Sequence, residues 1–537
     1  MNSFAGNLVA APVSHPRATT LKSETRRITW ATLVAVLLLP LLSMTIIPFY
    51  DTSEPRYAEI ARIMMTSGDW ITPWFSPGVP FWGKPPLSFW AQALSMKLFG
   101  LNEFAARLPS WVCLLLSNAI LISGVQRLKG RQIALWTAII YSTGALVYIS
   151  SGAVLTDPFL TLGTTLSLMS FATITQRRHT TYGNRDNRTP AFGNLANSPR
   201  TGWWSYGFFS GLVIGLLAKG PLALVLIGVP VAAWSVLNRK EVRLATLLPW
   251  RRGLLLVAIL VLPWYVLAEI KTPGFVSYFI VGEHFRRFVD PGWAGDLYGS
   301  AHKRAYGTIW YLWLQATFPY GPLLLATLIG ALFSARLRDS LAALRQDPLL
   351  SYWLACALFV PVFFTFSANI LWTYLLPSLA GFSVLAASIA MQIKARFTFP
   401  TRRFLVLAGL VPFALLIFSL IDGIYPDLRN TERTLVSYVQ QHSAPNTPVL
   451  YLSTPPFSAQ FYSRGRARQI EMAQLRHATS CNGPFYLAVP KHQQGLVAQI
   501  LDSNPAVELI NRRYVLMKIL ARDRCPRADT AALTPSR

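Results

Sequence analysis

Long apolar runs with almost no charge recur along the chain from about residue 29 to about residue 421. Each run is close to the ~20 residues that an α-helix needs to cross the hydrocarbon core of a bilayer. Only 13% of the residues are charged, which is about half of the usual share in a soluble domain. We therefore predict a polytopic α-helical membrane protein with about 11 to 13 transmembrane helices. The apolar segments that we count lie at 29–49, 104–126, 132–151, 156–175, 203–218, 221–237, 253–268, 308–333, 349–366, 372–393 and 403–421.

The basic residues, which give a net charge of +26, are divided unequally between the loops. If the N-terminal tail (1–28) is cytoplasmic, the loops on that side contain 24 Lys and Arg residues and the opposite loops contain 10. This asymmetry follows the positive-inside rule. It places the polar stretch after the first span and the C-terminal tail outside the cytoplasm. It also accounts for the positive charge without nucleic acid as a partner.

The composition changes after the last span, at Asp422. Short β-like runs alternate there with helix-compatible stretches, which predicts a small α/β extracytoplasmic domain at 422–537. A transmembrane domain would then occupy 29–421. Cys481 and Cys525 of the C-terminal domain could pair if that domain lies in an oxidising compartment.

The polar stretch between the first two spans, at 50–103, predicts two amphipathic helices on the membrane surface. Ser53 can cap the first helix, with Pro55 in its first turn. Apolar residues then share one face at helical spacing. The second helix would follow Pro85 and Pro86 and end near Phe99.

Lys84 stands directly before this second helix. The free amides of a helix N-terminus, the helix dipole and an ammonium group together form an anion site, for which phosphate is a natural ligand. The alternative is that the Lys84 side chain only extends to the lipid headgroups.

Acidic residues stand where two spans meet the same side of the membrane. Asp51 and Glu54 follow the first span, and Asp157 begins the fourth. Acids at this depth are costly unless they are paired or face a water-filled cavity. They could form salt bridges with Arg56 or Lys84, or they could act as carboxylates of one shared catalytic site.

Two segments of the polar stretch, SEPRYAEIARIMMTSGDWITP and GVPFWGKPPLSFWAQALSMKLFGLNEFAARLPS, resemble the first periplasmic loop of the ArnT-type transferases. These bacterial aminoarabinose transferases are related to the protein O-mannosyltransferases of the GT-C superfamily. The motifs LTDPFL, GLLAKGPLAL, GEHFRRF and TYLLPSLAG resemble later blocks in the same order. The resemblance covers roughly residues 30–390 and implies a GT-C-like fold.

The resemblance also implies an activity, a location and a site. The enzyme would be a glycosyltransferase that transfers a sugar, with inversion, from an undecaprenyl phosphate carrier to an envelope acceptor such as lipid A. The reaction would occur on the periplasmic side of the bacterial inner membrane, with membrane lipids as further partners. The predicted catalytic acids are Asp51, Glu54 and Asp157. The predicted substrate-binding residues are Arg56, Tyr57, Trp82, Lys84, Lys219, His284, Arg286 and Tyr374.

The chain departs from the family pattern at three places. Ser53 stands where the family usually has an Asp before Glu54, so Asp51 or Glu54 must replace the missing acid. A phosphate acceptor, already mostly ionised near neutral pH, would need little help from a base. Gly83 replaces the Glu that often precedes the lysine at 84, which argues against a divalent metal there, and no other cofactor is predicted. Ile370–Trp372 replaces a lysine that could contact phosphate.

Two alternatives to this function remain at the level of sequence. A protein O-glycosyltransferase would act on a hydroxyl acceptor and would need a real base. A flippase or transporter of the lipid-linked sugar would place charges near the bilayer midplane on broken helices. The charges of this chain lie instead in the outer loops and at the ends of spans, which favours an enzyme.

Overall fold

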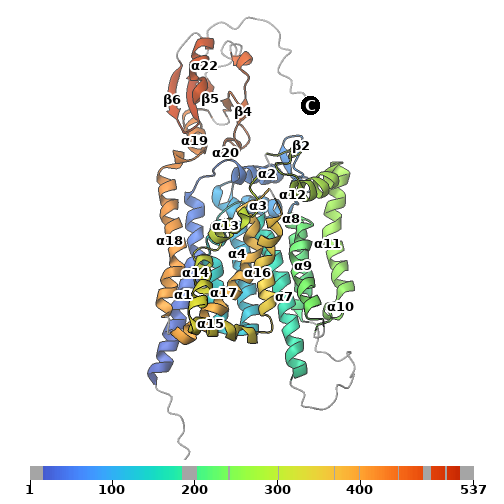
Figure 1. Cartoon of the computed structure of the whole chain (residues 1–537). Coiled ribbons are helices and arrows are strands. Elements are labelled where there is room, and N and C mark those ends of the chain that lie inside the picture. Colours follow the sequence, from blue (N-terminus) through green and yellow to red (C-terminus); the bar gives the residue numbers. More distant parts are fainter. Residues whose placement is uncertain are drawn as a thin grey trace, which may run out of the picture.

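The computed structural model describes residues 16–183, 202–239, 242–299, 302–367, 369–397, 400–444, 447–475, 485–501 and 505–520, with side chains outside 16–25 and 177–183. A bundle of long helices carries a small sheet domain at one end (Figure 1). The predicted class, a polytopic helical membrane protein with a C-terminal α/β domain, is confirmed. Cys481 and Cys525 lie outside the described residues.

Six described helices are long and apolar enough to cross a membrane: α1 (Pro16–Ile46), α4 (Glu103–Lys129), α7 (Asp157–Gly183), α11 (Trp250–Lys271), α17 (Leu376–Phe397) and α18 (Thr401–Ile424). Three bent pairs raise this number to nine: α5 (Arg131–Thr143) with α6 (Ala145–Ser151), α13 (Thr308–Ala316) with α14 (Tyr320–Phe333), and α15 (Ala335–Ala342) with α16 (Leu350–Thr365). Two shorter helices, α8 (Trp203–Lys219) and α9 (Leu222–Leu237), lie within the same bundle (Figure 1). If both cross the membrane, the described spans number eleven, as the apolar segments predict.

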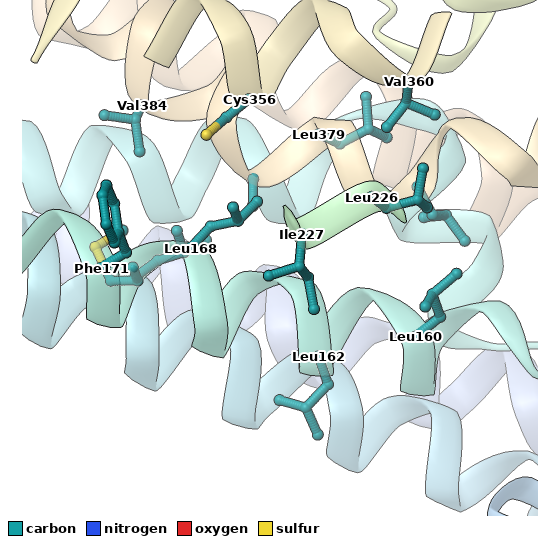
Figure 2. Packing of buried hydrophobic residues seen from close by; sticks show 14 of the residues in the cluster. Leu160, Leu162, Leu168, Phe171, Leu226, Ile227, Cys356, Val360, Leu379 and Val384 are labelled. Atoms are coloured by element: carbon teal, nitrogen blue, oxygen red, sulfur yellow. The ribbon is translucent and has the colours of Figure 1, made fainter. Parts of the chain in front are cut away.

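The core of the bundle forms around α7. In its apolar window, 94% of the residues are buried, compared with 22% in the peripheral helix α11. Leucine and phenylalanine side chains of α7 pack against α9, α16 and α17 (Figure 2). Glycines allow α8 to approach closely, because a Cβ added at Gly163 would lie 2.6 Å from the carbonyl oxygen of Gly211. Close approach of backbones at small residues is typical of membrane helices, and here it fixes the position of the first residue of α7, Asp157.

The stretch between α1 and α4 forms α2 (Ser53–Ser67), the hairpin β1 (Trp74–Ser76) and β2 (Val79–Pro80), and α3 (Leu87–Phe99). Both predicted helices are present, and Gly68, with φ of 72°, ends the first. The apolar face of α2 packs against other parts of the protein: Ile60, Ala61 and Met64 are fully buried in a cluster that includes Phe89 of α3. Helix α2 lies across the end of the bundle (Figure 1), and its position on the membrane surface stays a prediction.

The C-terminal domain is a five-stranded sheet with the order β4-β3-β5-β7-β6. Strand β3 is parallel to β4 and β5, and β7 is antiparallel to β5 and β6. The strands are β3 (Val449–Tyr451), β4 (Arg468–Gln469), β5 (Phe485–Pro490), β6 (Ala506–Ile510) and β7 (Tyr514–Ile519), and the helices are α19 (Arg433–His442), α20 (Phe457–Tyr462) and α22 (Gln494–Leu501). The remaining short helices are α10 (Leu244–Leu247), η2 (Ser277–Arg286), α12 (Arg287–Val289), η3 (Ala343–Gln346), η4 (Trp372–Leu375), η5 (Pro426–Leu428) and η6 (Lys491–Gln493).

The close approach of α7 and α8 predicts that Gly163→Ala lowers the midpoint of thermal unfolding. Its new methyl group would meet backbone atoms that cannot move aside, and overpacking of this kind costs about 1–3 kcal/mol. Gly228→Ala in α9 is the matched control, because an added Cβ there meets nothing within 4 Å. The midpoint is measured for both variants in detergent, and equal midpoints would contradict the packing described.

Candidate functional site

Helices α2 and α3 and the C-terminal domain lie at one end of the bundle (Figure 1). Ion pairs link charged side chains from the loop that precedes α3 and from neighbouring helix ends. They come from the loop before α3, the start of α7, the end of α8, η2, α12 and the loop after α12. We name this group the charged cluster; its ionic members are Lys84, Asp157, Lys219, Glu283, Arg287 and Asp296.

One part of the charged cluster is a buried ion pair between α7 and α8. Lys219 Nζ lies 2.6 Å from Asp157 Oδ1, and each side chain is only 8% exposed. Asp157 stands at the N-terminus of its helix and Lys219 at the C-terminus of its own, so both charges are favourable to the helix dipoles. Two residues predicted for the site are therefore direct partners.

The other part is a chain of four charges. Lys84 Nζ lies 3.0 Å from Glu283 Oε2, Arg287 Nη1 lies 2.9 Å from Glu283 Oε1, and the same Nη1 lies 3.2 Å from Asp296 Oδ2. Burial by itself raises the pKa of Glu283, but Lys84 and Arg287 hold it below its ordinary value, because nearby cations favour the carboxylate. Glu283 is thus ionised and orients both cations.

His284 joins the two parts, and Tyr374 lies beside Lys219. Lys219 Nζ lies 4.8 Å from the centre of the Tyr374 ring, within the range of a cation–π contact. His284 lies next to Glu283 in the chain, and its Nε2 is 2.9 Å from the carbonyl oxygen of Lys219. Its Nδ1 is 2.8 Å from another backbone carbonyl oxygen. His284 therefore ties η2 to the end of α8.

The contacts of His284 show whether its ring nitrogens are available to a metal ion. Both of its ring nitrogens already lie against backbone carbonyl oxygens. In the described part of the chain, no group of three or more His, Cys, Asp or Glu side chains has a geometry suited to a metal ion.

Aromatic residues of the first loop lie around Tyr298. The Tyr298 hydroxyl accepts from the Trp82 backbone N–H at 2.9 Å and donates to the Pro80 carbonyl at 2.8 Å. Arg56 Nη1 donates to the Tyr298 carbonyl at 2.5 Å, and the Arg56 guanidinium lies 5.2 Å from the centre of the Tyr57 ring. The predicted residues Arg56 and Trp82 thus share one neighbour, Tyr298, that sequence reasoning did not identify, and Tyr57 lies beside Arg56.

Two of the predicted acids have basic partners other than those expected. Arg107 binds both carboxylate oxygens of Glu54, at 2.7 and 2.9 Å. Asp51 pairs with Arg513 of the C-terminal domain at 2.5 Å, and its side chain is only 2% exposed. The expectation of Arg56 or Lys84 as partner is wrong, because the acids are turned toward α4 and the C-terminal domain.

Arg286, a predicted substrate-binding residue, lies next to the charged cluster in the chain and is not one of its ion-paired members. Arg286 is exposed and has no carboxylate partner in the part of the chain that the structure describes, whereas its neighbour Arg287 belongs to the charged cluster. The segment forms the π-helix η2, which changes the directions of successive side chains relative to an α-helix. Glu283 and Arg287 were missed, although their i, i+4 spacing is a signal for a pair on one helix face.

The comparisons with known proteins agree with this fold. The family model of the dolichyl-phosphate-mannose-protein mannosyltransferases matches residues 26–279. The crystal structure of ArnT from Cupriavidus metallidurans bound to undecaprenyl phosphate superposes with a TM-score of 0.70 at 16% identity, over 92% of this chain and 98% of that one. The chain has the ArnT fold.

Curated proteins similar to this chain carry the name undecaprenyl phosphate-alpha-4-amino-4-deoxy-L-arabinose arabinosyl transferase. The protein of Aeromonas hydrophila is 29% identical over 369 residues, which are 68% of this chain and 60% of the relative. The protein of Edwardsiella ictaluri is 30% identical over 353 residues, which are 64% and 56%. The resemblance stated from the sequence motifs is confirmed, and the chain spans about three fifths of the length of these relatives.

The Asp157–Lys219 pair predicts a large loss of stability for Lys219→Met. Removal of one partner of a buried pair costs about 3–5 kcal/mol, because the other charge remains buried alone. The exposed pair Lys271–Asp69 is the matched control, and Lys271→Met should cost no more than about 1 kcal/mol. Unfolding midpoints in detergent measure both.

The double variant Asp157→Leu, Lys219→Met should recover most of the loss, because replacement of both charges by apolar side chains is often close to neutral. Equal losses for Lys219→Met and Lys271→Met would show that the buried pair does not hold α7 and α8 together.

Proposed function

We propose that this protein is a glycosyltransferase that transfers a sugar from undecaprenyl phosphate to an envelope acceptor such as lipid A. The names of the curated relatives and the ArnT structure with bound undecaprenyl phosphate support the donor class.

The observation that carries the proposal is a pair of unused guanidinium donors. Nε of Arg56 and Nε of Arg287 are both buried and lack an acceptor among the described residues. Arg287 pairs with Asp296 at 3.2 Å, and Arg56 donates to the carbonyl of Tyr298 at 2.5 Å, so both guanidinium groups contact the same short loop. Buried donors without partners require an explanation, and a phosphate group is the anion that arginines bind best.

The roles of the cations follow from the chemistry of the leaving group. When the sugar–phosphate bond breaks, negative charge grows on the carrier phosphate, and fixed cations stabilise that charge. Lys84 and Arg287, oriented by Glu283, are suited to this task. Lys219 is paired with Asp157 and lies against the ring of Tyr374. Its main role would therefore be to hold the site in place and not to bind the phosphate.

The acids favour an acceptor that is already ionised. Each of the three predicted catalytic acids is paired with a cation: Asp51 with Arg513, Glu54 with Arg107 and Asp157 with Lys219. A paired carboxylate is a weak base, and a hydroxyl acceptor would need a strong one. This supports a phosphate acceptor, as in a phosphorylated glycolipid, over the side-chain hydroxyl of a protein.

The site would face the periplasm of a bacterium, with the protein in the inner membrane and its N-terminus in the cytoplasm. The positive-inside rule supports this orientation, because the loops on the cytoplasmic side contain 24 of the 34 basic loop residues. The first loop and the C-terminal domain lie at the same end of the bundle (Figure 1), as this topology requires.

Mass spectrometry of envelope glycolipids tests the proposal in a strain that lacks the gene. Complementation with wild type should restore a sugar-sized mass on lipid A. Lys84→Ala and Arg287→Gln should each reduce the product about 100-fold, because they remove donors to the leaving phosphate. Lys97→Ala and Arg286→Gln, which change exposed residues near the same elements, should restore it fully.

Equal effects of Arg286→Gln and Arg287→Gln would contradict the assignment of the phosphate site. Unchanged glycolipids and glycoproteins, together with lipid-linked sugar accumulating on the cytoplasmic face, would overturn the transferase and indicate a flippase.

A further inference from the structure

The C-terminal domain is hydrogen-bonded to the short segment that joins α1 to α2. The Asp51 carboxylate accepts from the Ser458 backbone N–H at 2.8 Å, from Ser458 Oγ at 2.6 Å and from Arg513 Nη2 at 2.5 Å. The Asp51 backbone N–H donates to the Asn430 carbonyl at 3.0 Å. Three separate segments of the domain therefore converge on one residue, two positions before α2 begins.

The cation of this contact is itself held in place. Arg513 Nη2 lies 2.7 Å from Glu432 Oε1, and Asn511 Nδ2 donates to the other oxygen of Glu432 at 2.8 Å. Glu432 is fully buried, and Asp51 is nearly so. Buried charges of this kind contribute little net stability, but their directional hydrogen bonds select one arrangement of the parts that they join.

An aromatic contact leads from the same domain toward the charged cluster. The ring centre of Phe457, the residue before Ser458, lies 5.3 Å from the ring centre of Phe75 in β1. The ring centre of Phe75 lies 5.1 Å from that of Tyr298. Tyr298 holds the Arg56 side chain through its carbonyl and Trp82 through its hydroxyl. The domain thus reaches the surroundings of Arg56 by two routes, through the start of α2 and through β1.

A third contact fixes the other end of the first loop. The Tyr462 hydroxyl donates to Glu103 Oε1 at 2.9 Å, in the first turn of α4, and accepts from the Phe49 backbone N–H at 2.8 Å. Phe461 packs edge to face on Phe49 at 4.8 Å. Helix α20 therefore binds both the beginning and the end of the stretch that contains α2 and α3.

We propose that the C-terminal domain is a positioning element of the site and that Asp51 is a positioning residue, with Arg513 as its partner. The inference rests on the proposed function and deepens it. By fixing the start of α2, the domain sets the position of Arg56 and Tyr57, which lie in the first turns of that helix. A displacement of about 1 Å in such a group can cost about 100-fold in rate.

The first test compares Arg513→Met with Arg512→Met in the full-length protein. Arg513→Met keeps the length of the side chain and removes the guanidinium that binds Asp51. Arg512 is exposed and bonds only to the Leu428 carbonyl among the described residues, so Arg512→Met is the matched control. Amide hydrogen exchange in α2 should become faster in Arg513→Met and remain as in wild type in Arg512→Met, while exchange in α7 is the same in both. Unchanged protection of α2 in Arg513→Met would overturn the proposal.

The second test measures sugar transfer from an undecaprenyl-phosphate-linked donor. Arg513→Met should lower kcat about 10- to 100-fold and leave the KM for the donor within about threefold, because the carrier phosphate still finds Lys84 and Arg287. Asp51→Asn keeps an oxygen that accepts from Ser458, so it should lose no more than about tenfold. A loss to background in Asp51→Asn would mean that Asp51 is catalytic, which contradicts the proposal.

Two further controls keep the outcomes distinct. If Arg513→Met does not fold, Phe457→Leu interrupts the aromatic route without leaving an unpaired charge. It should lower kcat in the same way and make amide exchange faster in β1, and unchanged kcat together with unchanged exchange would overturn the proposal. If wild type transfers no sugar from any undecaprenyl-linked donor, the proposed function fails. Hydrogen exchange requires no substrate and still decides whether the domain positions α2.

Discussion

The ion pair between Asp157 and Lys219 is the interaction on which the arrangement of the site depends. It joins the start of α7, the most buried of the six long apolar helices described, to the end of α8, and the two helices approach closely at glycines. His284 Nε2 lies 2.9 Å from the backbone carbonyl oxygen of Lys219. This contact fixes the position of η2, which contains Glu283. A core built from apolar packing alone would not specify where these charges lie, whereas a buried pair has one favourable geometry.

The electrostatics of the site follow from which donors are used and which are not. Carboxylates orient the lysine and arginine side chains of the charged cluster, yet Nε of Arg56 and Nε of Arg287 have no acceptor in the described structure. An incoming phosphate can meet these donors without desolvating a free cation. The three predicted catalytic acids are each paired with a cation. The site is therefore better suited to stabilise a leaving anion than to remove a proton from the acceptor.

Sequence reasoning succeeded where the signal is local. The apolar runs predicted the spans, and helical periodicity with Pro and Gly at the ends predicted α2 and α3. It failed where partners are distant: Glu54 binds Arg107, 53 residues away, and Asp51 binds Arg513, 462 residues away. The ion pairs of Arg287 were also missed, because no sequence pattern predicts the π-helix of η2. The docking of the C-terminal domain on α2 has no sequence signal that we can identify, since it depends on tertiary packing.

The most direct test of the central claim is a cryo-electron microscopy structure of the protein with undecaprenyl phosphate. The account predicts density for the phosphate within hydrogen-bond distance of Lys84 Nζ and of Nε of Arg287, with the Asp157–Lys219 and Asp51–Arg513 pairs intact. Phosphate density elsewhere, with both guanidinium donors still unpartnered, would contradict it.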